Sequence, residues 1–297
     1  LYGPLAYSMQ DPTVVQLRHL ERELFRAWCQ WLCDPLADGQ HDKIARDSFE
    51  RLLSTMAAAL AGSPGPFLLD RFSTADIIFI PYLERMSASL AYYKGYLMRH
   101  QHEAIERWFA ALEVRPTYLA TQGDFHTHAH SLPPQMGGCY ANNTPLQRAL
   151  AHCIDIGQSP MNDTALMDAE TSQPSPPQSA LEAVARVLKH RDVLMGKTPV
   201  SQEIIEPALR SALTLLVSGH RSAPPAGAAS ALRYLRDRVS VPRDMSLHAA
   251  RRLRQALEAT ARLDPAEPDA QGPPIPIAHR LDQDPSPFLA PTSIASR

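Results

Sequence analysis

The sequence Ser73-Thr74-Ala75-Asp76 leads directly into an apolar run at residues 77–83. This order is typical of a capping box, in which Ser73 accepts a hydrogen bond from the backbone N–H of Asp76 and the Asp76 carboxylate accepts one from Ser73. The carboxylate also meets the positive end of the helix dipole. The pattern therefore predicts that a helix begins here, and we assign Ser73 and Asp76 to folding.

Apolar residues at spacings of three and four predict further amphipathic helices along the chain. In order, these helices are expected at residues 11–33, 42–60, 73–93, 102–114, 179–190, 201–219, 226–238 and 246–262. Pro81 removes one backbone N–H from the third helix and is expected to kink it. Residues 123–140 show no helical period. The sequence predicts an all-α protein.

Composition changes along the chain predict where one part ends and the next begins. Clusters of Pro, Gly, Ser and aromatic rings separate two helical parts, and a Pro-rich stretch follows the second. We expect a helical domain at residues 1–122, a ring- and Gly/Pro-rich loop segment at 123–156, a linker at 157–179, a small helical extension at 180–262 and a disordered Pro-rich tail at 263–297.

The overall charge and the cysteine content exclude several classes of protein. Lys+Arg 29 against Asp+Glu 31 gives a formal net charge of −2, so no nucleic-acid partner is expected. Four cysteines in 297 residues do not make a disulfide framework, which favours a reducing compartment. Every apolar run is far shorter than the roughly 20 residues that a membrane span needs.

Several segments occur in an order that resembles the all-helical C-terminal domain of the glutathione S-transferase superfamily. They are residues 67–76, Pro81, 84–86, 105–109 and 115–118. The resemblance covers roughly residues 1–120 and implies the helical bundle of that domain. Residues 234–246 look similar to the tail region of plant and algal glutathione-transferase-like proteins, and this kinship suggests a plastid or cytoplasmic location.

In that superfamily a preceding thioredoxin-like domain holds glutathione, contributing a Tyr, Ser or Cys at the sulfur and a cis-proline. Asp11-Pro12 has the pattern of an N-cap followed by a first-turn proline, which predicts that the first helix of the helical domain begins there. We therefore expect the thioredoxin-like domain to belong to the same protein, in cis, and to be missing upstream of this helix. The resemblance then implies glutathione as co-substrate and no catalytic residue in this chain. Its helical domain would lie on the electrophile side of a conjugation or thiol-transfer reaction.

A different class of function stays open beside this one. The chain is alternatively a non-catalytic protein-interaction or scaffold module of a larger assembly, for example in a plastid. Whether the protein is an enzyme is therefore undecided by the sequence. A homodimer and a protein partner for the extension also stay open.

Three tyrosines near the end of the third predicted helix are candidates for a substrate pocket. The resemblance implies that Tyr92, Tyr93 and Tyr96 lie on the side of the domain that faces the electrophile. The alternative is that these rings pack in the core, as aromatic residues at helix ends commonly do.

Three alternating histidines are the candidate metal ligands. In an extended segment His126, His128 and His130 would project to one side about 7 Å apart. Asp124 or Cys139 would complete a tetrahedral shell. The alternative is that the imidazoles pack or bond to backbone carbonyls in a Pro-flanked loop, and a metal-binding regulator is the corresponding third function.

Cys139 is the candidate reactive thiol. It follows two glycines that let backbone N–H groups approach, which lowers a cysteine pKa where a helix start or a cation lies nearby. The alternative is a small buried apolar residue after a turn. Cys29 and Cys33 share one helix face and are expected in the core.

Arginines gather near the end of the extension and could bind phosphate or an acidic protein surface, although a solvated helix face is the favoured interpretation. They are Arg233, Arg236, Arg238, Arg243, Arg251, Arg252 and Arg254.

Overall fold

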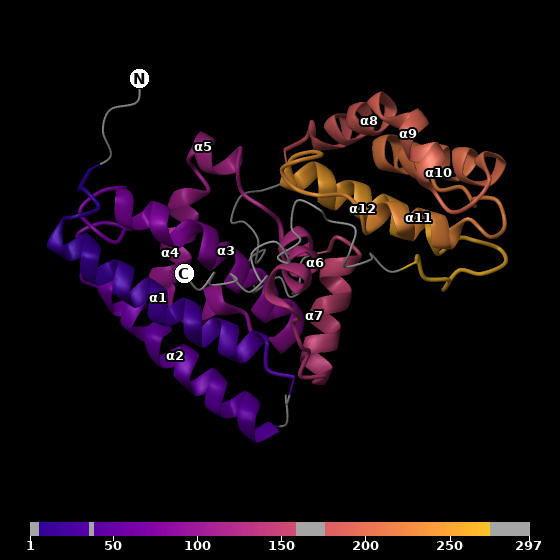
Figure 1. Ribbon diagram of the computed structural model, residues 1–297. Coiled ribbons are helices and arrows are strands. Elements are labelled where there is room, and N and C mark those ends of the chain that lie inside the picture. Colours follow the sequence, from indigo (N-terminus) through magenta and orange to yellow (C-terminus); the bar gives the residue numbers. More distant parts are fainter. Residues whose placement is uncertain (1–5, 36–38, 159–175, 274–297) are drawn as a thin grey trace, which may run out of the picture.

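The computed structural model describes residues 6–35, 39–158 and 176–273. Every regular element among these residues is a helix, which confirms the all-α prediction. The first helical body contains α1 (Pro12–Leu32), α2 (Gly39–Ala61), α3 (Thr74–Lys94), a 3-10 turn η1 (Met98–Gln101), α4 (Glu103–Leu112) and the single turn α5 (Pro116–Leu119). Figure 1 shows this body in indigo to purple.

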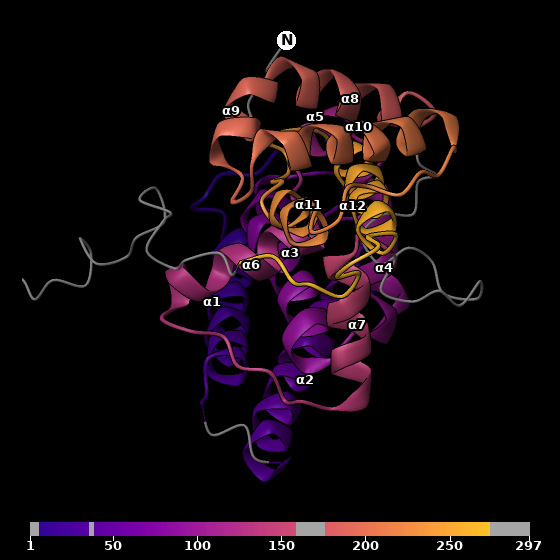
Figure 2. The same ribbon diagram turned by 90° about the vertical axis from the view of Figure 1, so that its right-hand side faces the viewer.

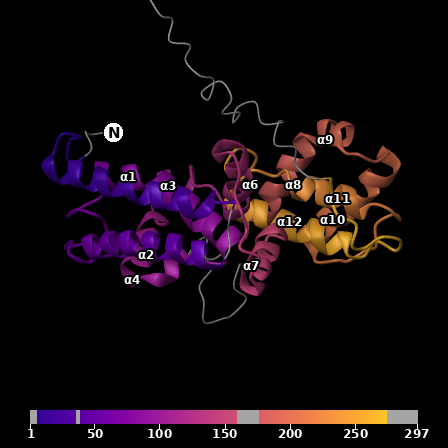
Figure 3. The same cartoon turned by 60° about the horizontal axis from the view of Figure 1, so that its bottom comes forward.

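A second helical body follows it in the sequence. It contains α8 (Ser179–Lys189), α9 (Arg191–Lys197), α10 (Gln202–Ser218), α11 (Ala229–Arg236) and α12 (Leu247–Ala261). Between the two bodies lie α6 (Phe125–Met136) and α7 (Pro145–Asp155), as the views in Figures 2 and 3 show. Within the described residues, no helix combines the length and the apolar character needed to span a membrane.

The core of the first body consists of large side chains from four helices. Trp28 and Trp31 of α1, Phe49 of α2, Leu83 of α3 and Trp108 of α4 are each at most 1% exposed. These are the apolar positions whose spacing predicted the helices, and burying them from water is the main stabilising contribution.

Asp76 is fully buried and is the polar centre of this body. Its Oδ2 accepts the backbone N–H of Ser73 at 2.9 Å and the Ser73 hydroxyl at 3.0 Å, and the predicted capping box is present. Its Oδ1 accepts the N–H of Leu68 at 3.0 Å and the indole N–H of Trp108 at 2.9 Å. One carboxylate therefore fixes the loop before α3, the start of α3 and the position of α4.

The prediction of a loop segment at residues 123–156 is wrong, because most of these residues form α6 and α7. Asp124 caps α6 by accepting the N–H of Thr127 at 2.9 Å. Thr144 caps α7 by accepting the N–H of Gln147 at 3.2 Å, with Pro145 in the first turn. These are ordinary N-terminal signals, and they outweigh the Pro- and His-rich composition that favoured a loop.

A tertiary contact lets α6 continue past its prolines. Pro133 has no N–H to donate to the carbonyl of Ala129 one turn earlier. The hydroxyl of Tyr93, on α3, donates to that carbonyl instead, at 3.1 Å. A side chain of the neighbouring helix thus replaces the missing backbone hydrogen bond.

The end of α3 is fitted closely to the start of α7. Gly95 closes α3 with a φ of +67°, and a Cβ there would lie 2.9 Å from the backbone nitrogen of Gln147. The side-chain amide of Gln147 donates to the carbonyl of Tyr92 at 2.6 Å. Only glycine allows both the left-handed backbone and this close approach.

The second body has a core of its own, built from buried residues that include Ile205, Ala208, Leu232, Leu253 and Leu257. Its five helices lie within or at the edge of the range expected for the extension. Residues 159–175 of the expected linker and 274–297 of the expected tail lie outside the described residues.

The first part of the expected tail is packed against the second body, in contrast to the prediction. Asp264 accepts the N–H groups of Gly227 at 3.1 Å and Ala229 at 2.8 Å, at the start of α11. The guanidinium of Arg233 donates to the carbonyl of Ala270 at 2.6 Å. Polar side chains therefore hold a segment that has too few apolar residues to fold by itself.

The expectation of a solvated arginine face is also wrong for three of its members. Arg233 and Arg236 are buried and donate to Glu258 of α12 at distances between 2.6 and 3.1 Å. Arg254 is fully buried and pairs with Asp124. The partners are distant in sequence or on another helix, so local patterns carry no sign of them.

The pair of Arg254 and Asp124 joins the second body to α6. Neither side chain is exposed, and Arg254 also donates to the carbonyl of Val239 at 2.7 Å. Burial by itself would raise the pKa of Asp124, but the charge of Arg254 and the hydrogen bonds of Thr127 hold that pKa below its usual value. Gly157 lies against the same arginine. A Cβ atom added to Gly157 would lie 2.7 Å from the Cβ of Arg254.

Replacing Asp76 with Ala should destabilise the first body strongly. The substitution leaves buried donors of Leu68, Ser73 and Trp108 without an acceptor, at a cost of about 1–3 kcal/mol each. We expect urea unfolding, followed by tryptophan fluorescence, to show a loss of about 3 kcal/mol or more. All 3 tryptophans lie in this body, so the signal reports it selectively.

The matched control is Asp70→Ala, which removes a carboxylate with 47% side-chain exposure six residues away. It should change the free energy of unfolding by no more than about 0.5 kcal/mol. Equal effects of the two substitutions would contradict a central role for Asp76.

Acid should weaken the second body through Glu258. Burial by itself opposes ionisation, but hydrogen bonds and charges of Arg233, Arg262 and Arg236 lower the Glu258 pKa from its ordinary 4.5 to about 2. Because the pKa is lower in the folded state, this stabilisation is complete above pH 4.5 and falls as the pH drops toward 2.

Urea unfolding followed by circular dichroism between pH 6 and pH 2 checks this dependence. Glu258→Gln should be less stable than the wild type at pH 6, and its free energy of unfolding should fall less steeply toward low pH. Parallel pH profiles would show that the carboxylate is not responsible.

Candidate functional site

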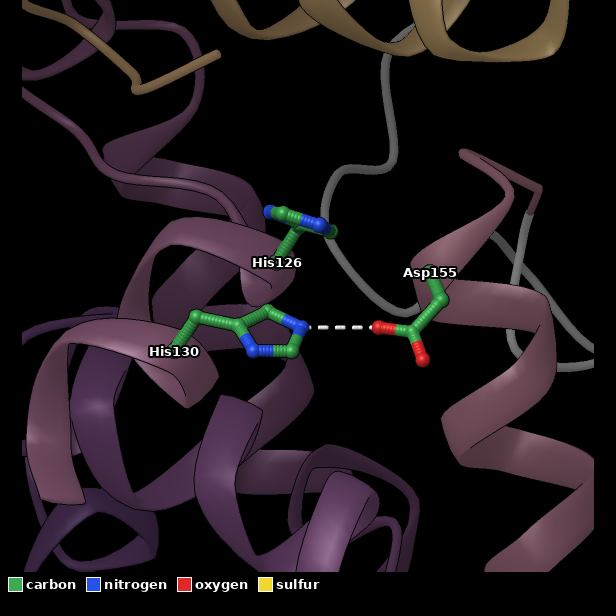
Figure 4. A group of neighbouring side chains, drawn as sticks. All are labelled: His126, His130 and Asp155. Atoms are coloured by element: carbon green, nitrogen blue, oxygen red, sulfur yellow. Dashed lines mark hydrogen bonds and ion pairs between the residues drawn. The ribbon is translucent and has the colours of Figure 1, made fainter. Parts of the chain in front are cut away.

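Two histidines of α6 and one aspartate of α7 form the candidate site. His126 and His130 are one helical turn apart and lie on the same side of α6, facing Asp155 at the end of α7 (Figure 4). Their potential ligand atoms all lie within 4.8 Å of one another. His126 is 2% exposed, whereas His130 and Asp155 are half-buried.

A hydrogen-bond network orients two of these groups. His130 Nε2 lies 2.8 Å from Oδ1 of Asp155, and the Tyr92 hydroxyl donates to Oδ2 at 3.1 Å. The rings of His126 and His130 are 4.4 Å apart between centroids, and Tyr92 packs edge-on against His130 at 5.1 Å. Burial and the nearby Asp155 charge raise the pKa of Tyr92, so its hydroxyl keeps its proton and acts as a donor.

This set of side chains has the chemistry of a metal site. Two imidazoles with one carboxylate are ligands that Zn²⁺ accepts, and the same combination holds ferrous iron in other proteins. In a tetrahedral zinc shell neighbouring ligand atoms are about 3.3 Å apart, so an ion would have to draw the three side chains closer together. The direct contact of His130 with Asp155 is the competing arrangement.

The predicted metal set of His126, His128 and His130 needs a correction. It assumed an extended segment, but in a helix the fourth residue along, and not the second, lies on the same face. His128 is turned away and its Nε2 lies 3.3 Å from Glu84. The additional ligands considered, Asp124 and Cys139, are engaged elsewhere, with Arg254 and with Cys33.

The three candidate tyrosines have separate surroundings. Tyr92 belongs to the cluster just described, and Tyr93 bonds to the carbonyl of Ala129. Tyr96 is 5% exposed, with its ring against Trp31 at 5.3 Å and Phe49 at 6.2 Å. Tyr96 is therefore a core residue, in agreement with the alternative interpretation of these tyrosines.

Cys139, the candidate reactive thiol, lies in surroundings that do not lower its pKa. The hydrogen bond with Cys33 and burial raise the pKa of the Cys139 thiol. The same bond lowers the pKa of Cys33, assisted by the charge of Lys94 and opposed by burial. Cys29 and Cys33 pack against the core as predicted.

Asp155 is the site residue that the sequence analysis missed. The overlooked signal is Thr144-Pro145, an N-cap followed by a first-turn proline, which marks the start of α7. Even with α7 recognised, the contact between its last residue and α6 depends on how the two helices pack, which no local pattern specifies.

Comparisons with known proteins identify the first body. A family model described as glutathione S-transferase, C-terminal domain, matches residues 17–111, from within α1 to the end of α4. Neither the curated proteins nor the solved structures gave a match. The capping box of Asp76 and most of the core residues of α1 to α4 fall inside the matched range. Residues 17–111 are accordingly a C-terminal domain of the glutathione S-transferase superfamily.

Proposed function

We propose that the first helical body is the electrophile-side half of a glutathione-transferase-like protein and works beside a thioredoxin-like half that holds glutathione. The family match at residues 17–111 is the observation that carries this proposal. In this division of work the thioredoxin-like half binds glutathione and activates its thiol. The helical half positions the second substrate for attack by the thiolate.

A groove between α1 and α3 is the candidate surface on which the thioredoxin-like half would dock. It has a volume of about 540 Å³ and is lined by Val15 of α1 and by Ile77, Pro81 and Tyr82 of α3. Met9 and Ile77 are each 40% exposed, although both side chains are large and apolar. Exposed apolar groups with charged neighbours are typical of a surface that another domain covers.

Charged residues at the groove would fix the orientation of the docked half. The guanidinium of Arg22 lies 4.8 Å from the ring centre of Tyr82 and 4.9 Å from that of Phe25, and it pairs with the buried Glu21. Contacts with two rings and a carboxylate restrain the guanidinium, which favours a specific interface over a loose one.

The test uses the product of the whole reading frame with Ile77→Lys in the groove. Val217→Lys on α10, where the side chain is 54% exposed, is the matched control. We expect the wild type and the control to bind immobilised glutathione and to conjugate an activated aryl halide. Ile77→Lys should lower the conjugation rate roughly tenfold, because a charged side chain cannot be buried between the two halves.

The outcome also decides between the two classes of function. If the wild-type protein neither binds immobilised glutathione nor conjugates the aryl halide, the enzyme proposal fails. The non-catalytic interaction module then becomes the better account, supported by the separate core of the second body. If Ile77→Lys leaves the rate unchanged, the groove is not the docking surface.

We propose metal binding as a second function, because His126, His130 and Asp155 bring three ligand atoms within 4.8 Å. The two histidines and the aspartate would hold the ion, and Tyr92 would orient Asp155 through its hydrogen bond.

Titration of the purified chain with Zn²⁺ in a calorimeter tests this function. We expect one equivalent to bind, with binding lost in His130→Ala and kept in His128→Ala, provided that circular dichroism shows both variants folded. His128 is the matched control because it lies on the same helix outside the cluster. Equal losses in the two variants, or no uptake by the wild type, would exclude the site.

A further inference from the structure

The second body contains a cavity of about 470 Å³ that shares no residue with the family match or with the histidine cluster. Its floor is the core of this body, formed by Val187, Leu209, Leu235, Met245, Leu253 and Leu257. Each of these side chains is at most 8% exposed. The cavity thus offers a deep apolar surface to which helices α8, α10, α11 and α12 all contribute.

The mouth of the cavity is basic. The charged side chains that line it, together with one histidine, are Arg186, His190, Lys197, Arg238, Arg243 and Asp244. Asp244 is the acidic member, and its oxygens already accept the backbone N–H of Ser240 at 2.7 Å and the guanidinium of Arg243 at 2.9 Å. The lining therefore carries an excess of positive charge around an apolar floor.

Two of the cations remain available to a ligand. Within the described part of the chain, Arg186 and Lys197 form no ion pair with an acidic side chain, and both are exposed. Arg238 is held in place at the same mouth, with its guanidinium 3.7 Å from the ring centre of Tyr234. An anionic group at the mouth would meet the charges of Arg186 and Lys197, neither of which pairs with an acidic side chain among the described residues.

We propose that this cavity binds an amphiphilic anion, namely a long-chain carboxylate. Its hydrocarbon chain would lie on the apolar floor, and its head group would lie among Arg186, Lys197 and Arg238. The volume falls in the range of small-molecule sites, which combine an apolar lining with a few polar groups that fix orientation. A neutral or cationic head group would gain nothing from this mouth, so charge complementarity selects the anion.

Calorimetry with the whole chain and three ligands of equal tail length tests the proposal. The ligands are laurate, dodecanol and dodecyltrimethylammonium, with the two ions below their micelle concentrations and the alcohol below its solubility limit. We expect laurate to bind most tightly and the cationic analogue least tightly, with an advantage for laurate that falls as salt is added. Equal binding of the three, or no binding of laurate, would overturn the proposal.

Charge reversal at the mouth tests whether laurate binds in this cavity. The double substitution Arg186→Glu and Lys197→Glu should weaken laurate binding by roughly tenfold or more. Lys189→Glu is the matched control, since it is exposed on α8 near Arg186 but does not line the cavity, and it should leave the affinity unchanged. An unchanged affinity in the folded double variant, or an equal loss in the control, would place the binding elsewhere and reject the site.

Discussion

The buried carboxylate of Asp76 is the interaction on which the first body depends. Its two oxygens accept four hydrogen bonds, from the backbone of Leu68, from the backbone and hydroxyl of Ser73 and from the indole of Trp108. A fully buried carboxylate is tolerated only when such donors surround it. Because the donors come from a loop, a helix start and a second helix, satisfying them fixes all three segments together.

The same principle joins the second body to α6. Asp124 caps α6 and pairs with Arg254 of α12, and both side chains are completely buried. A pair of this kind contributes less to stability than to geometry, because removing the charges from water offsets much of their attraction. The pair determines how the second body packs against α6. The hydroxyl of Thr127 accepts a further hydrogen bond across this contact, from the backbone N–H of Val241 at 3.0 Å.

The candidate site depends on this arrangement of helices. His126 and His130 lie on one face of α6 because Asp124 starts that helix and because Tyr93 lets it continue past Pro133. Asp155 reaches them because α7 docks on the end of α3 through Gly95 and Gln147. The site is therefore a product of packing between α3, α6 and α7.

The sequence by itself determined the helical class, the helix start at Ser73 and the family of residues 17–111. These features depend on capping chemistry and on apolar spacing, which act between residues close together in the chain. The sequence did not reveal α6. The rings and prolines of residues 123–140 favoured a loop, and they outweighed the N-cap signal of Asp124 when only neighbouring residues were considered.

Only the tertiary structure decided which polar groups meet. The His130–Asp155 contact spans 25 residues of sequence and the Arg254–Asp124 pair spans 130. The choice of partner follows from how whole helices pack and from the requirement that each buried charged group be paired with an opposite charge or satisfied by hydrogen bonds. That requirement acts across space, so a pattern of neighbouring residues cannot express it.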